Sequence, residues 1–120
     1  MIVGVGIDLI EIDRIRAALS RTPSLRRRIW TSAEWEGCAD RVERLAARFA
    51  AKEAVAKAIG TGVRGFSLVD VEVISDGVGR PSVVLRGPAI AVAEARGVAV
   101  VHLSLTTSDA VAAAYAVAEG

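Results

Sequence analysis

Two carboxylates, two lysines and a histidine are the residues of this 120-residue chain whose placement suggests chemistry. Asp8 follows Gly4 and Gly6 on one face of an expected N-terminal strand, where glycines let a helix, another backbone or a ligand approach closely. Glu53 falls on the apolar side of a long helix expected over residues 41–59, where an uncompensated carboxylate is costly. Two oxygen ligands with little else suit Mg²⁺, which keeps several waters and takes its other ligands from substrate phosphates.

Each of these acids also has an ordinary structural interpretation. Asp8-x-x-Glu11 matches a capping box for a helix over Glu11–Leu19, and the functional interpretation of Asp8 requires a second acid nearby. Glu53 and Lys57 could form an ion pair between successive helical turns, worth a few tenths of a kcal/mol. That pair would explain Lys57, but it would not explain why Glu53 shares a side with Phe49.

The long helix carries further charges in ordered rows. Arg44, Arg48 and Lys52 are spaced by four, so they form either a solvated face or a strip of cations for phosphate groups. Gly60-Thr61-Gly62 ends the helix as a C-cap and turn, and it is weak evidence for phosphate binding because it follows a helix instead of opening one. The expected apolar side comprises Val42, Leu45, Ala46, Phe49 and Ala56.

The elements that must position these residues follow the order strand, several helices, then mainly β structure with one inserted helix. This order predicts a single α+β domain over residues 1–120, in which one long central helix packs on a mainly antiparallel sheet. Thr31 and Glu34 have capping-box spacing and open a short helix. The expected strands are Ile2–Leu9, Leu68–Ser75, Ser82–Arg86, Val98–Leu105 and Ala110–Ala118, with a turn over Asp76–Pro81 and a helix over Pro88–Ala95.

Composition excludes several classes of function. The chain is 52% hydrophobic and 24% charged, which indicates a folded domain, and its net charge of +1 gives no general case for nucleic acid or a membrane surface. The single cysteine, Cys38, excludes an internal disulfide and suits a reducing cytoplasm. The N-terminus lacks the features of a signal peptide, and no apolar run reaches the ~18 residues of a membrane span. We therefore expect a cytoplasmic protein.

One segment is basic although the whole chain is nearly neutral. Arginines recur between residues 14 and 28, and their ordinary role would be a solvated helix face. The alternative is a docking surface for an acidic protein, where charge complementarity speeds encounter. The arginines are Arg14, Arg16, Arg21, Arg26, Arg27 and Arg28.

The motifs together resemble those of the holo-acyl-carrier-protein synthases, the short 4′-phosphopantetheinyl transferases. The resemblance covers nearly the whole chain, with the motifs in family order. The most specific are the RFAAKEA heptad at residues 48–54 and the GxDxxExxR start at residues 6–14. The others are Trp30-Thr31-x-x-Glu34, Lys57, Gly60-Thr61-Gly62, Gly79-Arg80-Pro81 and His102-Leu103-Ser104-Leu105.

The resemblance implies transfer of the phosphopantetheine arm of coenzyme A to a serine of apo-acyl carrier protein, with release of adenosine 3′,5′-bisphosphate. It implies Mg²⁺ bound by Asp8 and Glu53, and catalytic roles for Glu53, Lys57 and His102. The expected contacts to coenzyme A come from Arg48, Lys52, Lys57, Gly62, Pro81 and His102. The expected docking residues for the carrier protein are Arg14, Arg21 and Arg26.

The resemblance also implies a homotrimer with active sites between subunits, in which the Gly79-Arg80-Pro81 hairpin reaches a neighbour's acid pair. One departure is visible, because this chain has Thr107 where family members often have a second histidine. The alternative function is a non-catalytic oligomeric domain that binds a carrier protein or a nucleotide-like ligand. The presence of Asp8, Glu53 and Lys57 together favours the enzyme, since a decayed site has little reason to keep all three.

Overall fold

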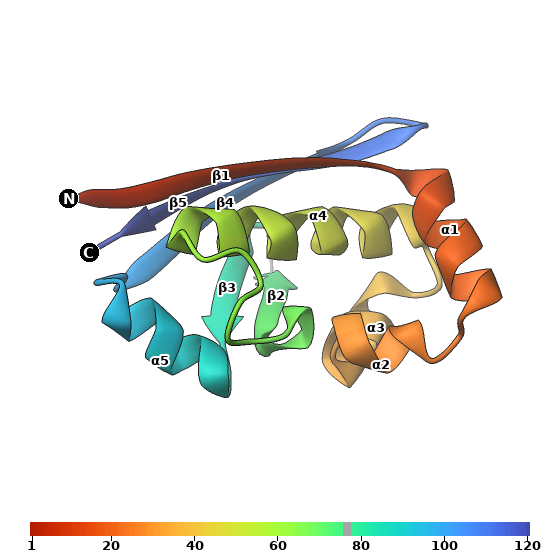
Figure 1. The fold of residues 1–120 in the computed structure, drawn as a ribbon. Helices are drawn as coiled ribbons and strands as arrows, with labels where there is room; N and C mark the ends of the chain where they lie inside the picture. Colours follow the sequence, from red (N-terminus) through yellow and green to blue (C-terminus); the bar gives the residue numbers. More distant parts are fainter. Residues whose placement is uncertain (76–77) are drawn as a thin grey trace.

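The computed structural model describes residues 1–75 and 78–120, and its elements follow the expected α+β order (Figure 1). A long helix, α4, runs along one face of a sheet; α1 lies beyond one end of α4, and the other helices lie on the side of α4 away from the sheet. The strands are β1 (Ile2–Glu11), β2 (Val71–Ser75), β3 (Pro81–Leu85), β4 (Val100–Thr107) and β5 (Val111–Glu119). The helices are α1 (Ile12–Arg21), α2 (Leu25–Ile29), α3 (Ser32–Cys38), α4 (Val42–Ile59) and α5 (Pro88–Ala95), with a 3₁₀ helix at Leu68–Asp70.

The main sheet has three antiparallel strands in the order β1-β5-β4, and α4 packs closely on it. Close packing is possible because β1 has glycines where it meets the helix. A Cβ atom at Gly4 would collide with the carbonyl oxygen of Ala58, and one at Gly6 would collide with that of Ala54. Asp8 comes next on this face of β1, so the glycines that bring strand and helix together also bring Asp8 beside α4.

The β2–β3 hairpin forms a separate two-stranded sheet. Val71 pairs with Leu85 at one end and Ser75 pairs with Pro81 at the other. Two residues of the expected turn, Asp76 and Gly77, lie outside the described residues. Because the hairpin is not hydrogen-bonded to the main sheet, its position against α4 depends on side-chain contacts.

The face of the main sheet that points away from α4 is exposed, and much of it is apolar. On β1, Val3, Val5, Ile7 and Leu9 point away from the helix and are 40–64% exposed. An exposed apolar patch of this kind on a small domain marks an interaction surface. Its large members are Val3, Val5, Ile7, Leu9, Val100 and Tyr115.

The predicted helix cap at Asp8 is wrong. β1 continues to Glu11, which pairs with Val111, and Asp8 lies inside the strand opposite Ala114. Glu11 is the N-cap of α1, and no side chain accepts a hydrogen bond there. The pairing with β5 therefore carries the strand past the point where the local pattern would begin a helix.

Other local predictions are confirmed. The side chain of Thr31 accepts a hydrogen bond from the backbone of Glu34, and the Glu34 side chain accepts one from the backbone of Thr31, which completes the capping box. Gly60 ends α4 in the left-handed conformation, with φ of 97°.

The expected start of the strand at Leu68 is wrong, because Leu68–Asp70 forms a 3₁₀ turn and the strand begins at Val71. Among the described residues, no helix has the length and apolar character to cross a bilayer.

Candidate functional site

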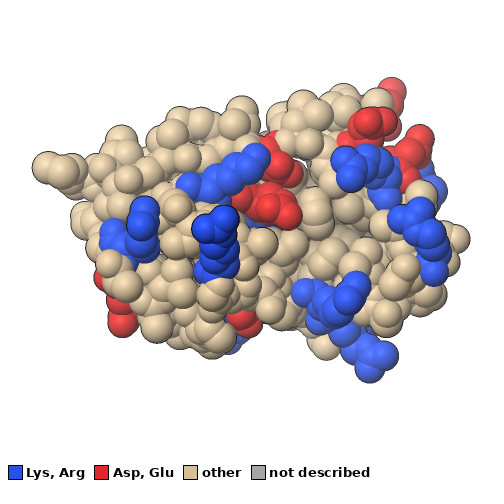
Figure 2. Space-filling model, viewed as in Figure 1, with Lys and Arg blue, Asp and Glu red and all other residues tan. Residues whose placement is uncertain are grey.

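The structure brings Asp8, Glu53 and Lys57 together where β1 runs beside α4. The Lys57 ammonium donates to Asp8 Oδ1 at 3.2 Å and to the carbonyl oxygen of Ile7 at 2.9 Å. Glu53 lies one helical turn before Lys57, close enough to Asp8 for the two negative charges to interact. Figure 2 shows acidic and basic side chains adjoining over the region where β1 and α4 lie side by side.

The negative charge of this acid pair is only partly balanced by the nearby lysine, so the site can accept a cation. Burial raises the pKa of Glu53, the nearby charge of Asp8 raises it further, and the ammonium of Lys57 partly opposes both. One lysine therefore faces two carboxylates. No described cluster unites three or more His, Cys, Asp or Glu side chains, so a metal here would draw only two ligands from the protein. Two carboxylate ligands with positions left for water and phosphate oxygens fit Mg²⁺.

Two details of the expected acid site need correction. Glu53, expected on the apolar side of α4, is half-buried, and Phe49 on the same side is half-buried as well. Lys57 forms its ion pair with Asp8, and the pair between Glu53 and Lys57 that the ordinary structural interpretation offered is absent from the described contacts.

The prediction that Lys52 lies on an exposed cationic strip is wrong. Its side chain is 0% exposed, and its ammonium donates to Glu34 Oε1 at 2.7 Å and to the Val71 carbonyl oxygen at 2.5 Å. These contacts leave Lys52 no access to a coenzyme A phosphate. Successive positions spaced by four rotate by about 40° around a helix, so Lys52 lies about 80° from Arg44 and turns into the core.

Lys52 belongs to a buried polar network that the sequence did not reveal. The Thr31 hydroxyl donates to Glu72 Oε2 at 2.7 Å, and Arg86 donates through two nitrogens to Glu72 Oε1 at 3.1 and 2.6 Å. Through Glu34 and Thr31 the network joins α4, α3 and the β2–β3 hairpin. The capping box was the only local signal, and it gave no sign that Glu34 also binds a lysine on α4.

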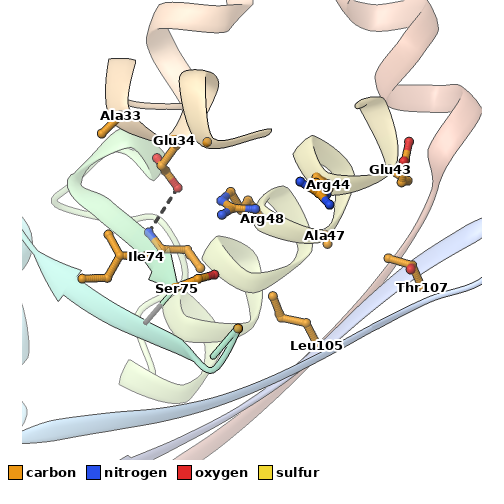
Figure 3. Close-up of a pocket in the computed structure, with 13 residues that line it drawn as sticks. Ala33, Glu34, Glu43, Arg44, Ala47, Arg48, Ile74, Ser75, Leu105 and Thr107 are labelled. Atoms are coloured by element: carbon orange, nitrogen blue, oxygen red, sulfur yellow. Dashed lines mark hydrogen bonds between the residues drawn. The ribbon is translucent and has the colours of Figure 1, made fainter. Parts of the chain in front are cut away.

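A cavity of about 790 Å³ lies on the other side of α4. It is bounded by α3, by the β2–β3 hairpin and by β4, and the guanidinium of Arg48 lies at its centre (Figure 3). Arg48 is half-buried and lines the cavity, and its buried Nε atom has no hydrogen-bond partner, so one donor of the guanidinium is not satisfied by the protein. Arg44, Gly79 and Thr107 also line this cavity.

The remaining predicted coenzyme A residues lie apart from the acid pair. His102 is on β4, with β5 between it and β1, and its Nε2 atom lies 3.0 Å from Glu119 Oε1. Pro81 is the first residue of β3, and Gly62 lies in the loop after α4. Among the described residues, none of these three forms a hydrogen bond or ion pair with Asp8 or Glu53.

The basic segment forms an exposed surface over α1 and α2, and Figure 2 shows basic side chains at that end of the molecule. Arg14 and Arg21 lie on α1 and Arg26 lies on α2, all exposed. The guanidinium of Arg26 stands 4.3 Å above the ring of Trp35, which meets Trp30 edge-to-face at 5.9 Å. The two tryptophans thus pack against each other, and Trp35 packs against Arg26 within this surface.

Comparison with known proteins matches residues 4–116 to the 4′-phosphopantetheinyl transferase superfamily. The chain is 51% identical over 118 residues to the holo-[acyl-carrier-protein] synthase of Frankia alni, with 98% of each chain covered. It is 43% identical over 123 residues to the synthase of Clostridium tetani, with all of this chain and 98% of the relative covered.

Solved structures of such synthases have the same fold. The synthase from Neisseria meningitidis superposes with a TM-score of 0.88 at 36% identity, with both chains fully covered. The synthase from Bacillus anthracis, solved in complex with coenzyme A (3′,5′-ADP), superposes with a TM-score of 0.82 at 36% identity. That alignment covers all of this chain and 98% of the other.

Proposed function

The chain belongs to the 4′-phosphopantetheinyl transferase superfamily, and we propose that it works with Mg²⁺ bound by Asp8 and Glu53. It is a holo-acyl-carrier-protein synthase, a transferase that moves phosphopantetheine from coenzyme A to apo-acyl carrier protein. The observation that carries the metal proposal is the pairing of two carboxylates with a single lysine, together with the raised pKa of Glu53. A divalent cation would compensate that surplus negative charge.

The metal would supply a Lewis acid for the phosphoryl oxygens, worth several kcal/mol of transition-state stabilisation. Asp8 and Glu53 provide its oxygen ligands from two rigid elements, β1 and α4. Lys57 is held beside them by Asp8 and the Ile7 carbonyl oxygen, with about half of its side chain exposed. Its ammonium can therefore bind the leaving phosphate and donate a proton to it.

Arg48 is proposed to contact the phosphates of coenzyme A from the cavity on the other side of α4. Its position at the centre of the cavity supports this role, as does the absence of any ion pair of Arg48 among the described contacts (Figure 3). Arg48 and Glu53 are five residues apart, so they point about 140° away from each other around the helix axis. A single chain therefore presents the acid pair and the arginine cavity in different directions.

This separation supports a homotrimer in which the cavity of one subunit completes the acid pair of the next. The exposed apolar face of the main sheet supplies surface that such an assembly would cover. Gly79 lines the cavity, so a neighbour that approached the cavity would also meet the β2–β3 hairpin. Pro81, Gly62 and His102 are proposed to contact coenzyme A in the assembled site.

The exposed arginines of α1 and α2 are proposed to dock the apo-acyl carrier protein. Arg14 and Arg21 are exposed on one helix, and Arg26 is held by Trp35, so a cationic surface is presented with little ordering cost. The alternative, a non-catalytic binding domain, does not account for a lysine placed beside two carboxylates.

The proposal is tested by incubating the protein with coenzyme A, Mg²⁺ and an apo-acyl carrier protein. Mass spectrometry should show one phosphopantetheine group added to the carrier, and light scattering should report a trimer. A carrier of unchanged mass, with the enzyme folded and the metal present, would contradict the catalytic function.

A further inference from the structure

Glu34 and Arg48 line the same cavity, yet they do not pair. The Glu34 side chain is fully buried in the cavity wall, and the Arg48 Nε atom is buried without a partner (Figure 3). Opposite charges in a partly closed site attract strongly, because the surroundings screen them less than water does. The described contacts nevertheless include no ion pair between these two side chains, so something holds the carboxylate away from the guanidinium.

The hydrogen bonds of Glu34 account for its position. Its Oε1 atom accepts from the Lys52 ammonium at 2.7 Å and from the Thr31 backbone N–H at 2.9 Å. Its Oε2 atom accepts from the Val73 backbone N–H at 3.1 Å. One of the three donors is a full positive charge, so Lys52 neutralises Glu34 inside the wall.

Lys52 is in turn fixed from its other side. Besides Glu34, its ammonium donates to the carbonyl oxygens of Val71 at 2.5 Å and Leu68 at 3.3 Å, so all three of its protons have acceptors. Burial lowers the pKa of Lys52, and Glu34 raises it. Arg48 adds a smaller lowering, which places its positive charge near this pair.

We propose that Lys52 is a positioning residue of the anion site: it retains Glu34 in the cavity wall and so leaves Arg48 available to a phosphate group. This inference rests on the proposed function, in which Arg48 contacts the phosphates of coenzyme A. If Lys52 loses its charge, the Glu34 carboxylate keeps only two backbone donors. Arg48 and Arg44 are then the cations that line the same cavity, and an Arg48–Glu34 pair would compete with the phosphate.

The competition makes a specific prediction about paired substitutions. Lys52→Met should weaken binding of adenosine 3′,5′-bisphosphate, measured by calorimetry, by about tenfold. Adding Glu34→Gln to Lys52→Met removes the competing carboxylate, and it should return the affinity to within about threefold of the unmodified protein. The comparison is made at a temperature where thermal melting shows both variants fully folded, because Glu34→Gln also restores stability. Under that condition, rescue is not expected if Lys52 only stabilises the fold.

A matched control variant removes contacts of the same network at a residue that does not line the cavity. Glu72→Gln disrupts the contacts with Thr31 and Arg86, but Glu72 does not line the cavity. This variant should bind adenosine 3′,5′-bisphosphate as the unmodified protein does, even if it melts earlier. Equal weakening in Glu72→Gln and Lys52→Met would overturn the proposal, because it would point to general loosening of the network.

The outcomes also separate this proposal from the function on which it rests. Arg48→Gln should itself weaken binding, and unchanged affinity in that variant would reject the role of Arg48 in the proposed function. If Arg48→Gln weakens binding but the double variant remains as weak as Lys52→Met, the positioning role of Lys52 is rejected. Circular dichroism checks each fold. Lys52→Gln, which keeps a donor in the wall, provides the same comparison if Lys52→Met does not fold.

Discussion

The two lysines of α4 lie five residues apart and occupy opposite kinds of charged environment. Lys52 is 0% exposed and forms a closed network in which two carboxylates, Glu34 and Glu72, are matched by Lys52 and Arg86. Lys57 is about half-exposed and faces two carboxylates of which it pairs with only one, Asp8. The closed network has positive and negative groups in equal number, whereas the open cluster has an excess of negative charge.

This difference separates residues that hold the structure from residues that bind a ligand. In the network the hydrogen bonds are directed between elements, so they set the position of the β2–β3 hairpin against α4. In the open cluster, burial and the nearby charge of Asp8 raise the pKa of Glu53, and the single lysine beside the two carboxylates only partly opposes this. We therefore expect substitutions in the cluster to affect catalysis first and those in the network to affect stability first, with Lys52 acting on ligand binding through Glu34 and Arg48.

The largest expected effect is on catalysis by Glu53→Ala. Loss of a metal ligand removes several kcal/mol of transition-state stabilisation, and each 1.36 kcal/mol is tenfold in rate, so transfer should fall by about a thousandfold or more. The fold should remain intact because the substitution also removes a half-buried carboxylate whose charge Asp8 repels. Turnover is measured by carrier modification and stability by thermal melting. Normal turnover in the presence of Mg²⁺ would remove Glu53 from the site.

Exchanging the two lysines for methionine tests the comparison directly. Lys52→Met removes the charged partner of the buried Glu34 carboxylate and should lower the free energy of unfolding by about 3–5 kcal/mol, less to the extent that Arg48 pairs with Glu34. Lys57→Met removes a half-exposed pair and should cost only about 0–1 kcal/mol, while it strongly lowers turnover. Urea unfolding and initial rates measure the two effects. Similar losses of stability in both variants would show that the two environments do not differ as described.

A smaller effect is expected at the arginine surface, away from both clusters. Arg14→Glu reverses an exposed charge and should raise KM for the carrier protein by about tenfold, more at low salt than at high salt. KM for coenzyme A should stay unchanged. Arg41 is also exposed but lies outside residues 14–28, so Arg41→Glu is a matched control. An effect confined to coenzyme A would contradict the docking role.

The smallest expected effect is on how steeply the free energy of unfolding falls at acidic pH. Hydrogen bonds from Thr31 and Arg86 hold the pKa of Glu72 below its ordinary value, so the folded state binds its proton less readily than the unfolded state does. The contribution of Glu72 to stability is therefore present above its unfolded pKa and is lost as pH falls through the lowered folded pKa. Urea unfolding across this range should show a shallower acid loss in Glu72→Gln. If the free energy of unfolding falls equally steeply with pH in both proteins, Glu72 is not the cause of the loss of stability in acid.

Much of the fold followed from local sequence signals. The long helix, its Gly60 terminus, the Thr31–Glu34 capping box and the α+β order are each determined by neighbouring residues or by periodicity, and the structure has them. The cap predicted at Asp8 failed because strand pairing with β5, a contact between the two ends of the chain, continued β1 to Glu11. No local pattern contains that information.

The candidate site was predictable in part for the same reason. The meeting of Asp8, Glu53 and Lys57 follows from the glycines of β1 and the spacing on α4, both visible in the sequence. The burial of Lys52 depends on Glu34, which lies 18 positions earlier, and on the backbone of β2. The separation of His102 from Asp8 depends on the strand order β1-β5-β4, which the sequence does not specify.

The most direct test of the central claim is the metal dependence of transfer in the unmodified protein. Carrier modification is followed by mass spectrometry after chelation with EDTA and again after Mg²⁺ is restored, alongside Asp8→Asn and Glu53→Gln. The acid-pair account predicts that chelation stops transfer, that Mg²⁺ restores it, and that neither variant recovers at the same Mg²⁺ concentration. Full transfer by the chelated protein, or full recovery of both variants with Mg²⁺, would contradict it.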